Sequence, residues 1–130
     1  MKDARLMELL HIKDVKTNYS VKDIEDHKIL AALSYFFPFW ILTVILCRKS
    51  RYTIFHSRQA AVLTLIEVVF AFLACLIGTL LLPVSLWFGA LFIPLWLICT
   101  ALLAGHVLYA YSALTGKAKT LPFLDVLAED

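Results

Sequence analysis

Three long apolar runs constrain this chain more than any other feature of its sequence. They cover residues 29–47, 60–82 and 84–114, and the only charged side chain within them is Glu67. A helix of about twenty residues crosses the ~30 Å hydrocarbon core of a bilayer. With 62% hydrophobic and 17% charged residues, the chain of 130 residues has too few charges to cover a soluble domain. We therefore expect an all-α fold, a polytopic transmembrane helical bundle with about three spanning helices.

The first apolar run, residues 29–47, carries Pro38 at its centre. Proline removes one backbone hydrogen bond from a helix and kinks it. We expect a Pro-kinked helix that crosses the membrane once. The alternative is a re-entrant hairpin that turns at residues 37–39, a shape that is tolerated only where its backbone is buried in protein.

The second and third runs differ in length. Residues 60–82 suit one crossing, and the proline that follows ends that helix. Residues 84–114 would form a helix ~46 Å long, too long for one straight crossing and too short for two crossings with a turn. We expect an interfacial or half-inserted piece over residues 84–93, followed by a spanning helix over residues 94–114.

The polar ends of the chain complete the expected organisation. Gly116 follows the last apolar residue, as is typical of a helix end. The expected division is a polar N-terminal segment, a transmembrane domain and a C-terminal amphipathic tail along the membrane surface, at residues 1–28, 29–116 and 117–130.

The N-terminal segment has two helical signals. Ser20 followed by Asp23 is typical of a capped helix that begins near Val21. The leucines at positions 6, 9 and 10 have loosely helical spacing, which fits a short surface helix or disorder. Because the segment is polar and lacks the pattern of a cleavable signal, insertion is expected through the first internal apolar run.

Basic residues indicate the orientation. Arg48, Lys49, Arg51 and Arg58 lie in the first connector without an acidic neighbour, and such loops face the cytoplasm. The lysines of the tail favour the same side. Three crossings would separate the two termini, whereas the N-terminal segment carries six Lys/Arg that also favour the inside. A hairpin over residues 29–47 would place both termini inside, and the sequence leaves the two topologies open.

Within the connector, specific side chains are expected at the membrane edge. Tyr52 and Phe55 would lie at the level of the lipid headgroups. Ser57 would cap the start of the second spanning helix. Arg58 and Gln59 would lie at the membrane face, able to bind lipid phosphate, the tail or the end of the first run.

Glu67 and His106 form the candidate intramembrane polar pair. Ionisable residues are costly inside a membrane and therefore mark candidate functional positions. Glu67 lies ~10 Å and His106 ~12 Å from the basic side of the bilayer, at 1.5 Å per helical residue. We expect the two side chains to be in contact as a polar clasp between two helices. A proton relay or ion site is the alternative role.

The sequence predicts no catalytic, cofactor-binding or metal-binding residue. Cys47, Cys75 and Cys99 are expected to be free, buried thiols, because they lie far apart inside apolar runs. A metal site at His27 and His56 and a Ser57–His56–Glu67 triad are both disfavoured, the triad because adjacent helical residues do not face each other. Scattered basic residues and a net charge of +2 do not favour nucleic acid as a partner.

Three blocks of sequence resemble a known family. They are residues 33–38, the block from Tyr52 to Ala61 that contains Phe55, His56, Arg58 and Gln59, and residues 111–117 followed by Leu121-Pro122-Phe123. The spacing Gly116-x-x-x-x-Leu121-Pro122 adds to the likeness. Over residues 27–127 the chain is similar to the Tic-twenty (Tic20-like) family, the membrane-embedded component of the chloroplast inner-envelope import machinery. It is equally similar to the small bacterial membrane proteins grouped with that family, among them the magnetosome protein MamF.

The resemblance implies a helical bundle with a non-enzymatic role. Ser57 departs from the alanine usual in the family, and the extra span and long leader of the plastid members have no counterpart in the sequence. We therefore expect a scaffold or assembly subunit of a membrane complex, of the protein-translocation or organelle-membrane type, in the bacterial inner membrane or a membrane derived from it. The expected partners are the lipid bilayer and other membrane proteins or further copies of the chain. The alternative is a small proton- or ion-coupled transporter that uses Glu67 and His106.

Overall fold

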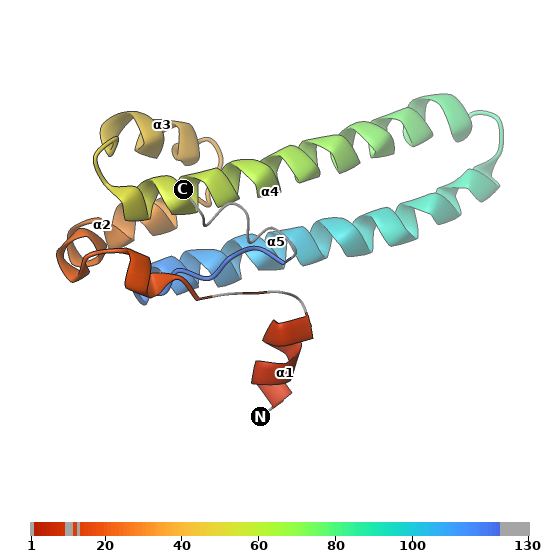
Figure 1. Ribbon diagram of the computed structural model, residues 1–130. Helices are drawn as coiled ribbons and strands as arrows, with labels where there is room; N and C mark the ends of the chain where they lie inside the picture. The colour runs from red at the N-terminus through yellow and green to blue at the C-terminus, as the bar shows by residue number, and fades with distance from the viewer. Residues whose placement is uncertain (1, 10–11, 13, 123–130) are drawn as a thin grey trace.

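A computed structural model describes residues 2–9, 12 and 14–122, and all regular elements in these ranges are helices. Two long antiparallel helices, α4 and α5, form an extended hairpin, and two shorter helices pack against one end of it (Figure 1). The elements are α1 Lys2–Leu9, η1 Lys16–Asn18, α2 Val21–Leu33, α3 Phe39–Leu46, α4 Arg51–Leu76, η2 Ile77–Leu81, η3 Leu86–Leu91 and α5 Phe92–Leu114. The end of the hairpin that carries α2 and α3 is called the packed end below.

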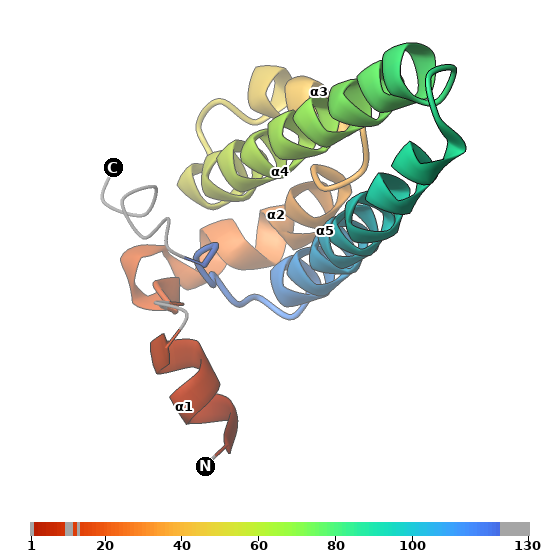
Figure 2. The same cartoon turned by 90° about the vertical axis from the view of Figure 1, so that its right-hand side faces the viewer.

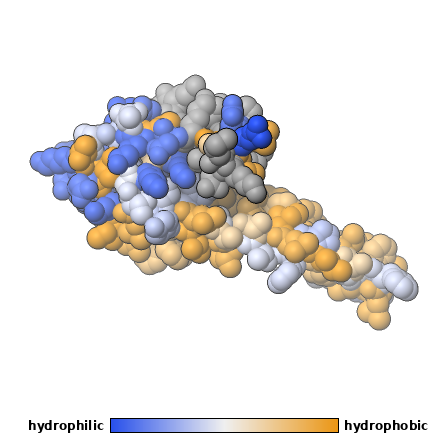
Figure 3. Space-filling view, turned by 90° about the horizontal axis from the view of Figure 1, so that it is seen from below, coloured by the Kyte–Doolittle hydropathy of each residue, from blue (hydrophilic) through white to orange (hydrophobic). Residues whose placement is uncertain are grey.

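The α4–α5 hairpin is apolar and largely uncovered. Its two arms, Arg51–Leu81 and Leu86–Leu114, are the two described helices long and apolar enough to cross a membrane. Only 17% and 0% of their most apolar windows are buried inside the fold, whereas the core helix of a soluble protein is mostly buried. Figure 3 shows the contrast between the hydrophilic packed end and the hydrophobic hairpin that projects from it.

The expected continuous helix over residues 29–47 is wrong. The chain leaves α2 at Leu33, turns through residues 34–38 and returns as α3 (Figures 1 and 2). Helices of 13 and 8 residues are ~20 and ~12 Å long and too short to cross a bilayer. The hairpin alternative matches this geometry. The start of its turn packs against protein, because Ser34 and Tyr35 are buried, whereas Phe36 and Phe37 are exposed.

Two helix starts show how local sequence sets the element bounds. Ser20 Oγ accepts a hydrogen bond from the amide of Asp23 at 3.1 Å, so α2 begins at Val21 as predicted. Ser50, not Ser57, caps α4: its Oγ accepts from the amide of Thr53. The expected Ser57 cap is wrong because the helix begins two turns earlier, in the polar stretch ahead of the apolar run.

The C-terminal end of α5 is a Schellman motif. The amide of Gly116 donates to the carbonyl of Ala113 and that of Lys117 to the carbonyl of Ser112. Gly116 has a φ of 71°, a backbone conformation that residues with a Cβ adopt at a cost. The predicted helix stop is thus confirmed in detail.

The third apolar run divides nearly as expected. The short helix η3 covers Leu86–Leu91 and α5 begins at Phe92. Pro94 lies in the first turn of α5, where its missing amide costs no hydrogen bond. Apolar side chains are exposed in the turn between the hairpin arms and in η3 after it: Val84 is 76% and Trp87 89% exposed.

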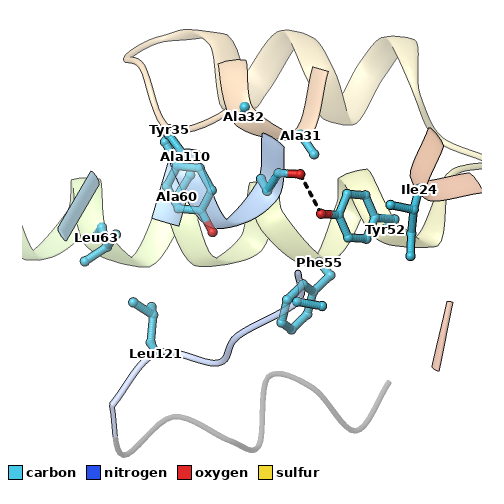
Figure 4. Packing of buried hydrophobic residues seen from close by; sticks show 12 residues of the cluster. Ile24, Ala31, Ala32, Tyr35, Tyr52, Phe55, Ala60, Leu63, Ala110 and Leu121 are labelled. Carbon is cyan, nitrogen blue, oxygen red and sulfur yellow. Dashed lines mark hydrogen bonds between the residues drawn. The ribbon is translucent and has the colours of Figure 1, made fainter. Parts of the chain in front are cut away.

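The core lies at the packed end, where α2, α4 and α5 meet the segment that follows α5. Figure 4 shows its main side chains, with the Tyr52 ring between α2 and α5. The cluster comprises Ile24, Ala31, Ala32, Tyr35, Tyr52, Phe55, Ala60, Leu63, Ala110, Ala113, Ala118 and Leu121. Many of these are alanines, so the helix backbones lie close together, as small residues permit.

The residues after α5 belong to this core. Ala118, Thr120 and Leu121 are buried, and the amide of Val15 donates to the carbonyl of Ala118 at 2.8 Å. The described part of the expected surface tail, residues 117–122, is therefore packed into the fold. Residues 123–130 of the tail lie outside the described ranges. The expected N-terminal helix is present as α1, and Leu10, expected to belong to it, also lies outside the described ranges.

Two of the three expected buried thiols are exposed. All three cysteines are free, but only Cys47 is buried, while Cys75 and Cys99 are exposed on α4 and α5. The prediction of burial is wrong for Cys75 and Cys99 because the hairpin arms present most of their apolar surface outward.

Candidate functional site

A stripe of polar side chains on α4 faces the interior of the packed end. Tyr52, His56 and Gln59 are fully buried, and their spacing of four and three residues places them on one face of the helix. Buried polar groups require hydrogen-bond partners. The partners come from the turn after α2 and from the backbone that follows α5.

Tyr52 ties the start of α4 to the end of α5. Its hydroxyl donates to the carbonyl of Ala113 at 2.8 Å, drawn as a dashed line in Figure 4, and to the carbonyl of Lys117 at 3.0 Å. Its amide donates to Oδ2 of Asp23 at 3.1 Å. One residue therefore joins α2, α4 and the Schellman motif.

His56 and Gln59 share the hydroxyl of Tyr35. This hydroxyl lies 2.9 Å from Nδ1 of His56 and donates to Oε1 of Gln59 at 3.4 Å. These two contacts form a chain from the His56 ring through the Tyr35 hydroxyl to Gln59. Nε2 of Gln59 then donates to the carbonyl of Lys119 at 3.0 Å, so the chain ends on backbone.

Two further buried polar contacts involve α4: one reaches Thr43 of α3, and the other lies within the first turn of α4. Ser57 Oγ and Thr43 Oγ1 are hydrogen bonded at 2.8 Å, and the hydroxyl of Ser50 donates to Thr53 Oγ1 at 3.0 Å. All four side chains are buried. Ser57 thus holds α3 in place rather than acting at a helix end.

Glu67 and His106 are in contact, as predicted from their depths. Oε1 of Glu67 lies 3.3 Å from Nδ1 of His106, and the side chains are 35% and 10% exposed. Nδ1 also lies 3.1 Å from the carbonyl of Leu102. A carbonyl oxygen can only accept, so Nδ1 of His106 is the donor in the hydrogen bond to Leu102, and the Glu67 carboxylate lies beside it.

The Glu67–His106 pair borders the Tyr35 chain. The rings of Tyr35 and His106 meet edge to face, with centroids 6.4 Å apart and planes at 90°. On its other side, the ring of Tyr35 stacks on Tyr109 at 6.1 Å, and the Tyr109 hydroxyl donates to the carbonyl of Thr120 at 2.9 Å. The Tyr35 ring also contacts the His56 ring. It therefore contacts three rings: those of His56, His106 and Tyr109.

The structure moves several predicted residues from the membrane edge into the core. Tyr52 and Phe55, expected at the headgroups, are buried because the connector is the first turn of α4. Gln59 contacts the tail, one of the three alternatives. Arg58 is exposed and Pro122 is half-buried.

The disfavoured metal and triad arrangements have no counterpart in the described geometry. His27 Nδ1 pairs with Asp23 Oδ1 at 3.0 Å, whereas His56 bonds to Tyr35. Ser57 faces Thr43 rather than His56. The described residues contain no group of three or more His, Cys, Asp or Glu side chains placed to hold a metal.

Sequence reasoning missed Tyr35, Thr43 and the role of Tyr52. The signal was present in the i, i+4, i+7 spacing of Tyr52, His56 and Gln59. These polar residues follow a helical period at the border of an apolar run, a pattern typical of a polar face buried against protein.

Comparison of the chain with models of protein families, with curated proteins and with solved structures finds no match. The resemblance to the Tic-twenty family therefore stays a prediction.

Proposed function

We propose that this protein is an integral membrane protein whose α4–α5 hairpin crosses the bilayer twice. The observation that carries the proposal is the apolar surface that the hairpin leaves uncovered. Exposed large apolar side chains follow both arms, among them Leu65, Val68, Phe72, Ile93, Trp96, Leu97, Leu103 and Val107. A soluble monomer rarely exposes a patch of this extent, whereas a bilayer of ~40–45 Å with headgroups fits arms of about thirty residues.

The arrangement of charge supports one orientation. The hydrogen bond between Tyr52 and Asp23 joins the starts of α2 and α4, and Val15 bonds to Ala118 after α5. The basic residues of the connector, the N-terminal segment and the tail therefore gather at the packed end. By the positive-inside rule this end faces the cytoplasm, and two crossings leave both polar segments on one side.

The role we propose is that of a non-enzymatic scaffold or assembly subunit of a membrane complex, of the protein-translocation or organelle-membrane type. Support comes from the polar network, whose bonds run from Tyr52, Gln59 and Tyr109 to backbone carbonyls. Such bonds hold helices in position. The exposed sides of the helices are available for contacts with other membrane-embedded helices. The resemblance to the Tic-twenty family supports the same role.

The native cysteines provide a direct test of the membrane location. Cys75 and Cys99 lie on the surface of the chain, so the bilayer, or a partner helix within it, would have to shield them from a membrane-impermeant charged maleimide. We expect no labelling in intact membranes and full labelling after denaturation in detergent. Labelling of either thiol in intact membranes would contradict the proposal.

Matched single-cysteine variants test the orientation. In a background without native cysteines, Lys22→Cys reports on the packed end and Val84→Cys on the hairpin turn, where both native side chains are exposed. We expect the two variants to be labelled from opposite sides of sealed vesicles. Labelling of both from the same side would exclude two crossings.

The scaffold role is tested by chemical crosslinking in native membranes followed by mild solubilisation. We expect a partner, or further copies of this chain, in fixed stoichiometry with the protein. Recovery as an uncrosslinked monomer at natural abundance would contradict the role.

A proton- or ion-coupled transporter is the second candidate, favoured by the 3.3 Å contact between Glu67 and His106. Purified protein in liposomes would then drive pH-dependent flux that Glu67→Gln abolishes. Unchanged flux in this variant, or flux no greater than that of empty liposomes, would exclude it.

A further inference from the structure

A groove lies beside the C-terminal end of α5. Its volume is about 260 Å³, and its lining includes Leu108, Tyr111 and Ser112 of α5, Lys117 and Lys119 of the segment that follows, and Ile12 opposite them. One end of the lining is therefore apolar and the other carries two positive charges. The groove is separate from the Glu67–His106 contact, neither residue of which lines it.

The floor of the groove contains an unsatisfied hydroxyl. Ser112 is 7% exposed, and its Oγ has no hydrogen-bond partner among the described residues. A buried hydroxyl without a partner costs free energy that a bound polar atom recovers. Because Ser112 belongs to the lining, a ligand oxygen that reached its hydroxyl would satisfy this donor.

The two lysines are held at the rim by their backbones. The carbonyl of Lys117 accepts from Tyr52 and that of Lys119 accepts from Gln59, so both positions are fixed without use of the side-chain amines. The backbones of Lys119 and the acidic residue Asp14 form an isolated antiparallel β-bridge. Oδ1 of Asp14 accepts a hydrogen bond from the amide of Lys16 at 3.1 Å.

The apolar side of the groove leads onto the hairpin. Leu108 and Tyr111 are both largely exposed and lie three residues apart, so they form one continuous ridge on α5. The same helix continues toward the exposed apolar side chains of the hairpin, such as Leu103. A ligand that fills the groove therefore needs an anionic head and an apolar chain.

We propose that this groove binds one anionic phospholipid. The phosphate lies between the amines of Lys117 and Lys119, the Ser112 hydroxyl donates to a headgroup oxygen, and one acyl chain follows Leu108 and Tyr111. Clusters of basic residues at the end of a spanning helix select anionic headgroups. The inference rests on the membrane location proposed above.

The test compares phosphatidylglycerol with phosphatidylcholine of the same acyl chains, added to delipidated protein in mild detergent and counted by native mass spectrometry. The variant is Lys117→Gln/Lys119→Gln, and the matched control is Lys22→Gln/Lys49→Gln, two lysines that do not line the groove. We expect tighter binding of phosphatidylglycerol to the wild type. Its affinity should fall ~30-fold in the variant, about fivefold per lysine, and less than ~2-fold in the control.

Two further measurements keep the proposal open to refutation if a variant fails to fold. Photoreactive phosphatidylglycerol with its reactive group on the acyl chain should crosslink the wild type within residues 108–119, and crosslinks confined to other segments would overturn the proposal. Inorganic phosphate at millimolar concentration should leave the lipid bound. Displacement of the lipid would show an anion site without lipid specificity and would overturn it.

The outcome is distinguishable from failure of the proposed function. Equal binding of the two lipids, with Cys75 and Cys99 still shielded in membranes, would refute the lipid site alone. Labelling of these thiols in intact membranes would refute the membrane location itself.

Discussion

The amide of Tyr52 donates a hydrogen bond to Oδ2 of Asp23 at 3.1 Å, which joins the first turns of α2 and α4. The first amides of a helix have no partner within the helix, and the helix dipole favours a negative charge there. Asp23 supplies that charge from a different helix. Its other oxygen, Oδ1, lies 3.0 Å from Nδ1 of His27, so one carboxylate fixes two elements of the packed end.

Removal of this carboxylate should loosen the packed end. We expect Asp23→Ala to lower the free energy of unfolding by ~1.5–3 kcal/mol, since a charge-assisted hydrogen bond and a favourable dipole contact are lost. Reversible unfolding in mixed micelles measures the change. Asp26→Ala, at an exposed position of the same helix, is the control and should change it by less than ~0.5 kcal/mol. Equal effects of the two variants would contradict this role of Asp23.

Removal of the Tyr52 hydroxyl should lower the stability of the packed end. Tyr52→Phe keeps the ring but leaves the carbonyls of Ala113 and Lys117 without this donor. We expect a loss of ~1–3 kcal/mol and faster amide hydrogen exchange at residues 113–118. Tyr111→Phe, at an exposed position of α5, should leave both measurements unchanged, and a similar loss there would argue against the assigned role.

Two glycines of the same region should respond in opposite directions to alanine. At Gly116 the φ of 71° disfavours a Cβ, and that Cβ would lie 3.1 Å from Cγ2 of Ile24, so Gly116→Ala should destabilise by ~1–2 kcal/mol. At Gly105, in the middle of α5, nothing lies within 4 Å of the added Cβ. Gly105→Ala should leave stability unchanged or raise it by up to ~1 kcal/mol. Thermal unfolding of the two variants side by side decides the matter.

The Glu67–His106 contact should appear as a coupling energy. In a double-mutant cycle of Glu67→Gln and His106→Ala, we expect the two changes to be non-additive by ~0.5–1.5 kcal/mol, the range for polar contacts between membrane helices. If the two changes in the free energy of unfolding were additive, a stabilising contact between Glu67 and His106 would be excluded. Leu65→Ala, at an exposed position of α4, combined with His106→Ala should be additive.

Features governed by local rules were predictable from the sequence. The Ser20 cap and the Gly116 stop follow from short-range chemistry of helix ends. The contact between Glu67 and His106 followed from counting residues inward from one membrane face, because the rise of a helix is constant. The apolar hairpin arms were evident from hydropathy alone.

Features set by tertiary contacts were not predictable in the same way. The apolar content of residues 29–47 is the same for a crossing helix and for a hairpin, and the choice depends on partners distant in sequence. Tyr35 at the turn bonds to His56, 21 residues away, and Thr43 of α3 bonds to Ser57. The start of α4 was placed too late for a related reason: a change in hydropathy marks the edge of the apolar surface, not the first residue of the helix.

The buried side chains of α4 and the segment after α5 have a consequence for synthesis. Tyr52, Gln59 and Tyr109 donate to carbonyls of residues 113–120, which leave the ribosome roughly sixty to seventy residues after α4 begins to emerge. Until then these groups have no native acceptor. The nascent chain can complete its packed end only after residue 120 has emerged. A product truncated at Leu114 would leave Gln59 and Tyr109 without their native acceptors, whereas Tyr52 would keep the carbonyl of Ala113.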